Sequence, residues 1–161
     1  MITNIWLDFV LILLFIILLA LAVFLIRRKL FKLWTKASRL EVSFHNSMKD
    51  CLRLFLRYEK TIRPFDPGGH LERLKMYEAI SLRTLPLEER QRIHRAIETL
   101  FVSLDETELT GYPTLKNMFD SLQSKRLRYN SCVLYYNHLV RVFPIRYFAN
   151  RFGFRTKEYF G

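Results

Sequence analysis

The residues best suited to chemistry are two Tyr-Asn pairs, Tyr129-Asn130 and Tyr136-Asn137, which lie seven residues apart. Seven residues are close to two helical turns, so both pairs would point in nearly the same direction from a helix. Phenol and amide groups donate and accept hydrogen bonds, so Tyr129, Asn130, Tyr136 and Asn137 could form a polar interaction strip. We favour the alternative that the tyrosines fill a helical seam while the asparagines bond to backbone or to neighbouring helices.

The sequence predicts no catalytic, cofactor-binding or metal site, and we expect no enzyme. His94 and Glu98 lie four residues apart, a pair that is common on the solvated face of a helix. A Gly-rich phosphate loop, a His-Glu-x-x-His motif and a nucleophile elbow are all missing from the sequence. We expect Cys51 and Cys132 to be buried thiols in a reducing compartment. No metal-ligand spacing relates the cysteines to the four histidines, which are His45, His70, His94 and His138.

A long apolar segment near the N-terminus must position everything that follows it. Residues 9–26 carry no charge, and extended back to Ile5 the segment has 22 residues. As a helix it would be about 33 Å long, which matches a hydrocarbon core of about 30 Å. We therefore predict a transmembrane helix over 5–26 after a short segment 1–4. A cleaved signal peptide with Ala20-Leu21-Ala22 at its cleavage site is the alternative, but no basic residue precedes the apolar run.

Charge is distributed unevenly about this segment. All 26 Lys and Arg residues follow residue 26, together with 14 of the 15 acidic residues. Basic residues that flank a span stay on the cytoplasmic side, so we expect the N-terminus outside and the C-terminal domain in the cytoplasm. Five of them stand directly behind the span as candidate contacts for anionic lipid, namely Arg27, Arg28, Lys29, Lys32 and Lys36.

The remaining chain has helical periodicity throughout and no sustained alternation, so we predict an all-α fold. Residues 27–62 form a basic juxtamembrane segment and a long helix, and Pro64, Pro67, Gly68 and Gly69 end it. Residues 63–161 supply shorter helices over 70–82 and 86–104, a polar connection over 105–111, a long helix over 115–143 and an aromatic tail. We expect a three- to four-helix antiparallel bundle with long first and last helices.

Apolar residues at alternating three- and four-residue steps define a seam on each helix. The first seam comprises Leu30, Trp34, Ala37, Glu41, Phe44, Met48, Cys51, Phe55, Tyr58 and Ile62. The 86–104 seam comprises Ile93, Ile97, Leu100 and Leu104. The last comprises Leu115, Phe119, Leu122, Arg126, Tyr129, Val133, Tyr136, Val140 and Phe143.

The tail that follows Pro144 interleaves aromatic and basic side chains, which permits three interpretations. Packing against the bundle is the one we favour, and lying in the membrane surface comes second. Nucleic-acid binding comes third, and we expect no nucleic-acid partner, because a membrane-tethered domain already has acidic headgroups beside it.

The C-terminal part of the chain contains an ordered series of short motifs. They are Tyr112-Pro113-x-Leu115-Lys116, Phe119-x-x-Leu122-Gln123, Tyr129-Asn130-x-x-Val133-x-x-Tyr136-Asn137, Phe143-Pro144, Ala149-x-x-x-Gly153-Phe154 and Tyr159-Phe160. With these motifs the chain resembles the LemA family, membrane-anchored helical proteins of bacteria and archaea. Only residues 124–128 stand where the family usually has a longer insert, so the chain is similar to a shortened, divergent member. The resemblance implies an N-terminal span, a helical domain at the bacterial inner (cytoplasmic) membrane and no generally established enzymatic activity.

Together these observations predict a single-pass membrane protein whose helical domain is a non-catalytic interaction or scaffolding module. Its expected partners are the membrane and either another protein or a second copy of the chain. One alternative is a membrane-tethered enzyme subunit, which would need ionisable groups converging on a polar pocket. The other is a binder of anionic lipid or nucleic acid that uses the basic aromatic tail.

Overall fold

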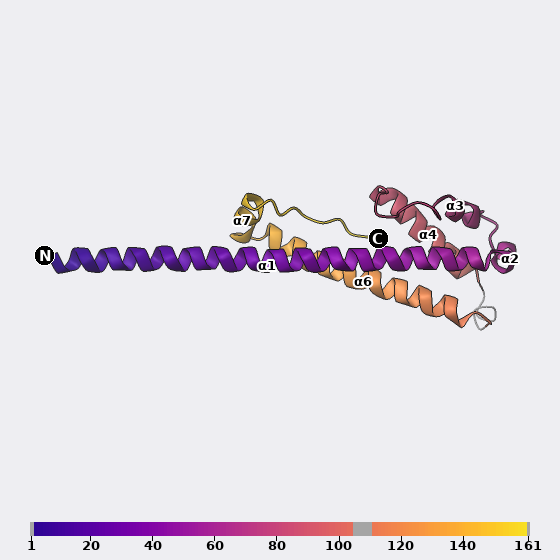
Figure 1. The fold of residues 1–161 in the computed structure, drawn as a ribbon, viewed down its shortest axis with the longest axis horizontal. Coiled ribbons are helices and arrows are strands. Elements are labelled where there is room, and N and C mark those ends of the chain that lie inside the picture. Colours follow the sequence, from indigo (N-terminus) through magenta and orange to yellow (C-terminus); the bar gives the residue numbers. More distant parts are fainter. Residues whose placement is uncertain (1, 105–110, 161) are drawn as a thin grey trace. The chain divides into compact units, whose positions relative to one another are not determined.

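A computed structural model describes residues 2–104 and 111–160, with side chains from residue 6 onward (Figure 1). Over these residues the chain is helical and contains no strand, which confirms the all-α prediction. The polar connection expected over 105–111 lies outside the described residues except for Gly111. The elements are α1 (Ile2–Arg57), α2 (Glu59–Ile62), the 3-10 helix η1 (Arg63–Phe65), α3 (His70–Met76), α4 (Leu87–Ser103), α6 (Pro113–Arg141) and α7 (Ile145–Arg151).

The chain divides into two compact units, to each of which α1 and α6 contribute a part. Unit 1 contains residues 2–36 and 132–158, and unit 2 contains the described residues of 37–131 together with 159–160. No Pro or Gly interrupts the sequence before Arg63, and α1 accordingly continues as one helix from the apolar segment to Arg57 (Figure 1).

Unit 1 packs the basic end of the apolar segment against α6 and α7. Its core cluster contains Leu30 of α1, Tyr136 and Val140 of α6, and Ala149 of α7. Partly buried side chains surround this cluster, including Phe154 of the tail. Gly153, with φ of +75°, forms the turn expected between α7 and the tail, because that backbone conformation disfavours residues with a Cβ atom.

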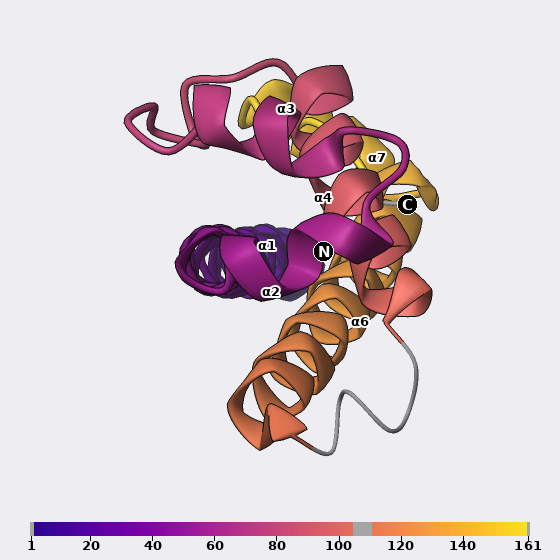
Figure 2. The ribbon, with the colours of Figure 1, turned by 90° about the vertical axis from the view of Figure 1, so that its right-hand side faces the viewer.

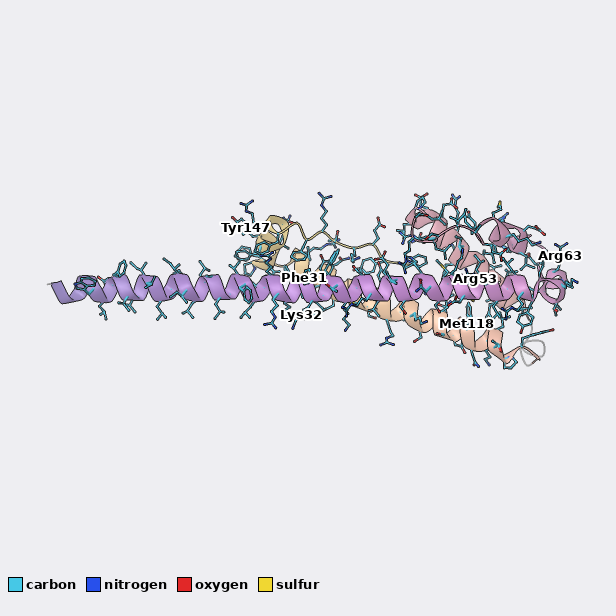
Figure 3. The ribbon with its side chains drawn as sticks, viewed as in Figure 1. Phe31, Lys32, Arg53, Arg63, Met118 and Tyr147 are labelled. Atoms are coloured by element: carbon cyan, nitrogen blue, oxygen red, sulfur yellow. The ribbon has the colours of Figure 1, made fainter. Side chains whose placement is uncertain are left out.

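One helix among the described residues, α1, is long and apolar enough to cross a membrane. Its most apolar stretch has no buried residue in the structure. Side chains project from this part of α1 without a covering element (Figure 3). An apolar helix surface that no protein covers is the pattern of a segment whose solvent is lipid.

Unit 2 is a helical bundle in which α6 runs antiparallel to both α1 and α4. Along α1 and α6, Phe44 stacks on Tyr129 with 6.4 Å between ring centroids, and Tyr58 lies 4.9 Å from Tyr112. Along α4 and α6, the Gln123 amide donates to the Glu98 carboxylate at 3.0 Å. Helix α3 packs beside α4 (Figure 2). The predicted seams supply most of the core, with Phe44, Met48, Cys51, Phe55, Ile93, Ile97, Leu100, Leu115 and Leu122 all buried.

The breaks fall where Pro and Gly predicted them, but the helix expected over 70–82 is shorter. It ends at Met76, and the following loop presents its carbonyl oxygens to a lysine of α1. The Lys49 ammonium donates to the carbonyls of Tyr77 at 3.0 Å and Ile80 at 2.7 Å, and to that of Glu78. A cation that satisfies three loop carbonyls replaces the hydrogen bonds that another helical turn would supply.

Two seam positions were wrong. The Trp34 side chain is 43% exposed, and its ring lies beneath the Lys157 ammonium at 5.6 Å. Phe143 is 84% exposed because α6 ends at Arg141, two residues before it, and Phe143 joins Pro144 through a cis peptide bond. The helix expected up to residue 62 also breaks at Tyr58, whose φ and ψ of −93° and 16° separate α1 from α2.

Candidate functional site

The second Tyr-Asn pair binds the chain's own C-terminal tail within unit 1. The Asn137 side-chain amide donates to the Lys157 carbonyl at 2.7 Å, and the Lys157 backbone N–H donates to Asn137 Oδ1 at 2.8 Å. The Tyr136 hydroxyl donates to the Arg155 carbonyl at 2.9 Å. A primary amide offers one donor and one acceptor side by side, so it pairs with an extended residue as a neighbouring strand would.

The first Tyr-Asn pair repeats this arrangement within unit 2. The Asn130 amide donates to the Phe160 carbonyl at 2.6 Å, and the Phe160 backbone N–H donates to Asn130 Oδ1 at 2.9 Å. The two asparagines are seven helical residues apart, a rise of about 10.5 Å, and their targets are three extended residues apart, about 10 Å. The seven-residue repeat in the sequence thus matches a three-residue repeat in the tail.

Replacing Asn137, which is only 2% exposed, by alanine removes both hydrogen bonds to Lys157. We expect a loss of about 2 kcal/mol in the free energy of unfolding, because two backbone groups lose their partners. Urea unfolding of the detergent-solubilised chain, followed by circular dichroism, measures it. Asn150→Ala, at an exposed position of α7, is the matched control, and equal losses in the two variants would contradict the proposed pairing.

The Phe160 ring fills a buried aromatic site in unit 2. It meets Phe44 edge-on with 4.6 Å between centroids, and His94 and His45 lie at 5.6 and 6.2 Å. Stacking of Phe44 on Tyr129 completes the group. Of the three interpretations of the aromatic tail, packing in the core is therefore the one that fits Phe160.

Both histidines of this site are buried, each only 3% exposed. Burial lowers the pKa of His45 to about 4, with the Arg90 guanidinium adding to the effect, and Arg90 Nη1 donates to His45 Nε2 at 3.0 Å. Burial also lowers the pKa of His94 to about 4, although Glu98 opposes the shift. His94 Nδ1 lies 3.5 Å from the Glu98 carboxylate. Because the His94 side chain is buried, the expectation that this pair occupies a solvated face was wrong for His94.

The two charged residues in the predicted seams find partners on α4. Glu41 lies 3.6 Å from Arg90, and Arg126 lies 3.5 Å from Glu98. All four side chains are partly buried, and an ion pair between packed helices must be matched in position, so these pairs restrict how α4 can pack against α1 and α6. We interpret the cluster as a structural support for the Phe160 site, because its imidazoles face an aromatic ring of the same chain.

Neither cysteine has the character of a nucleophile. Burial raises the pKa of the Cys51 thiol to about 12 and also raises that of Cys132, which is only partly buried. Both thiols are therefore protonated at neutral pH. Within the described ranges, no three His, Cys, Asp or Glu side chains stand close enough to hold a metal ion.

A basic, aromatic surface distinguishes unit 1 from unit 2. Unit 1 holds ten of the 26 Lys and Arg residues but only two of the 15 acidic ones, Asp8 and Glu158, which gives a formal net charge of +8. Arg27 lies 5.5 Å above the Phe152 ring and Lys29 lies 6.0 Å from Tyr135. Phe31 and Lys32 of α1 and Tyr147 of α7 are exposed on the same unit (Figure 3). All five predicted lipid contacts, Arg27, Arg28, Lys29, Lys32 and Lys36, are exposed.

In a comparison with known families, the model of the LemA family matches residues 89–161. Through this region the chain is similar to the LemA family. The matched LemA region contains both asparagine pairings and the Phe160 ring, whereas the apolar segment of α1 lies outside it. No curated protein and no solved structure gave a significant match.

The sequence pointed to the Tyr-Asn pairs but missed the residues that they serve. The Phe160 site and its partners His45 and His94 were not predicted, because nothing local marks a tail that returns to the bundle. The available signal was the three-residue spacing of Lys157 and Phe160 set against the seven-residue spacing of the asparagines. Glu41 and Arg126 were visible as charged residues in apolar seams, and such positions call for a buried partner.

Proposed function

We propose that this chain is a single-pass membrane protein of LemA type whose helical domain is a non-catalytic interaction or scaffolding module at the bacterial cytoplasmic membrane. The observation that carries the proposal is the formal net charge of +8 on unit 1. This unit contains both the uncovered apolar stretch of α1 and the basic residues that follow it. By the charge bias of spans, the N-terminus lies outside and the domain lies in the cytoplasm.

The use of the polar side chains supports a structural module rather than an enzyme. The asparagine amides and the Tyr136 hydroxyl bind the chain's own tail. The buried histidines have a lowered pKa and lie beside an aromatic ring, and both thiols have a raised pKa. A rival enzyme subunit would instead present such groups to a pocket open to substrate.

The proposed module needs a partner, which site-specific crosslinking in native membranes would identify. A photoreactive p-benzoylphenylalanine is placed at Val102 or at Leu127, which are exposed apolar positions of unit 2. We expect both positions to capture the same protein, or a second copy of the chain, and that protein to co-purify without crosslinking. The buried position Leu122 is the matched control and should capture nothing. Capture from neither exposed position would sink the scaffold proposal.

A further inference from the structure

A pocket of about 460 Å³ lies on unit 1, beside the apolar part of α1. Five apolar side chains of α1 form most of its wall, and Arg27 and Phe152 close one end. From the first to the last of the five, the helix rises about 12 Å. The five apolar residues are Ile16, Leu19, Ala20, Val23 and Phe24.

The chemistry of the lining changes from one end of the pocket to the other. Five residues of α1 contribute only hydrocarbon, and then Arg27 contributes the single formal charge. The Arg27 guanidinium is exposed and lies 5.5 Å from the Phe152 ring centroid, so its hydrogen-bond donors remain available. An occupant that suits this lining has a long apolar body and an anionic end.

The turn after α7 explains how Phe152 comes to lie at this pocket. Phe152 is the C-terminal cap of α7, and its backbone N–H donates to the Phe148 carbonyl at 2.9 Å. Gly153 follows with a positive φ and turns the chain into the extended tail that Asn137 binds. Phe152 is therefore fixed by the helix before it and by the tail after it.

We propose that this pocket binds one anionic phospholipid, with an acyl chain along Ile16 to Phe24 and the phosphate at Arg27. The proposal rests on the proposed function, in which this part of α1 lies in the bilayer. The occupant follows from charge complementarity, since Arg28 and Lys29 follow Arg27 and unit 1 has a net charge of +8. Guanidinium groups bind phosphate oxygens through paired hydrogen bonds, and an apolar wall of this length matches an acyl chain better than water.

Native mass spectrometry of the full-length chain in mild detergent tests the site. The protein is mixed with equal amounts of dioleoyl phosphatidylglycerol, which is anionic, and dioleoyl phosphatidylcholine, which carries no net charge. We expect one phosphatidylglycerol to be retained in preference to phosphatidylcholine. Arg27→Gln should weaken this binding about tenfold, as loss of one charge-assisted contact would. Phe152→Ala should weaken the retention of both lipids.

Arg28→Gln is the matched control, because Arg28 is exposed, neighbours Arg27 and does not line the pocket. Equal effects of the two substitutions, or equal retention of the two lipids, would overturn the proposal in favour of nonspecific attraction. Arg27→Lys keeps the charge and should keep the preference for phosphatidylglycerol, which separates loss of charge from misfolding. A chain that resists extraction from membranes yet shows no lipid preference sinks the lipid site alone and leaves the membrane anchor intact.

Discussion

Substituting Phe160 by alanine is expected to lower the free energy of unfolding by about 3–5 kcal/mol, the range for a buried Phe truncated to Ala. The side chain is 2% exposed, and its ring fills the space beside Phe44, His45 and His94. The substitution leaves a cavity, and it separates the tail from the side chains that hold it. Urea unfolding of the detergent-solubilised chain, followed by far-UV circular dichroism, gives the change directly.

Tyr159→Ala is the matched control for this measurement. Tyr159 is also aromatic and precedes Phe160, but it is 42% exposed. Its loss should change the free energy of unfolding by less than about 1 kcal/mol, as for most surface substitutions. If the two variants were equally destabilised, the tail would contribute through its general hydrophobicity and the Phe160 site would have no special role. A shift of the two imidazole pKa values toward 6.5 in Phe160→Ala, seen by NMR, would be an independent sign that the site has opened.

Acidification is expected to destabilise unit 2 between pH 6.5 and pH 4. In the folded chain the pKa of both His45 and His94 is lowered to about 4, whereas in the unfolded chain each imidazole has its ordinary value of about 6.5. Below pH 6.5 the unfolded state therefore takes up protons that the folded state does not. The contribution of these groups is complete above pH 6.5 and is lost as the pH falls toward 4, by about 3 kcal/mol for each imidazole.

Measurement of the urea midpoint from pH 7 to pH 4.5 tests this expectation while most carboxylates remain ionised. The groups that face the imidazoles are Arg90, Glu41 and Arg83 around His45, and Glu98 and Arg126 around His94. His94→Gln should remove about half of the pH dependence, and His138→Gln, at an exposed position of α6, should leave it unchanged. A midpoint that stayed constant down to pH 4.5 would show that the histidines are not held neutral by burial.

The sequence predicted well those features that depend on local periodicity. Leu122, Val133 and Ile97 occupy predicted seam positions and are buried, because a helix places every third or fourth residue on one face whatever packs there. Pro64 and Gly69 mark the end of the first long helix region for an equally local reason, since each disfavours helical continuation.

Features that depend on distant partners could not be predicted in this way. Helix α3 stops at Met76 because Lys49, more than twenty residues earlier, takes the loop carbonyls. The spacing of His94 and Glu98 suggests a surface position, but His94 is buried because α4 packs it against the Phe160 ring. The asparagines were recognised as polar groups that need partners, but a helical pattern does not show that an extended tail supplies them.

The contacts between the tail and the Tyr-Asn pairs lie within the region that matches the family. Residues 89–161 contain the helix that carries the Tyr-Asn pairs and the tail that those pairs bind, so the family match and the tail contacts coincide. The apolar stretch of α1 lies outside the match, and its proposed role as a membrane anchor follows from its apolar composition and from the charge behind it.

We expect an uncleaved N-terminal helix to anchor this protein in the membrane. The most direct test of this expectation is an alkaline carbonate wash of membranes from expressing cells, followed by the mass of the intact protein in each fraction. The chain should stay in the membrane pellet at the full mass of 19.4 kDa. A soluble product that begins near Val23, or full-length chain released by the wash, would contradict it.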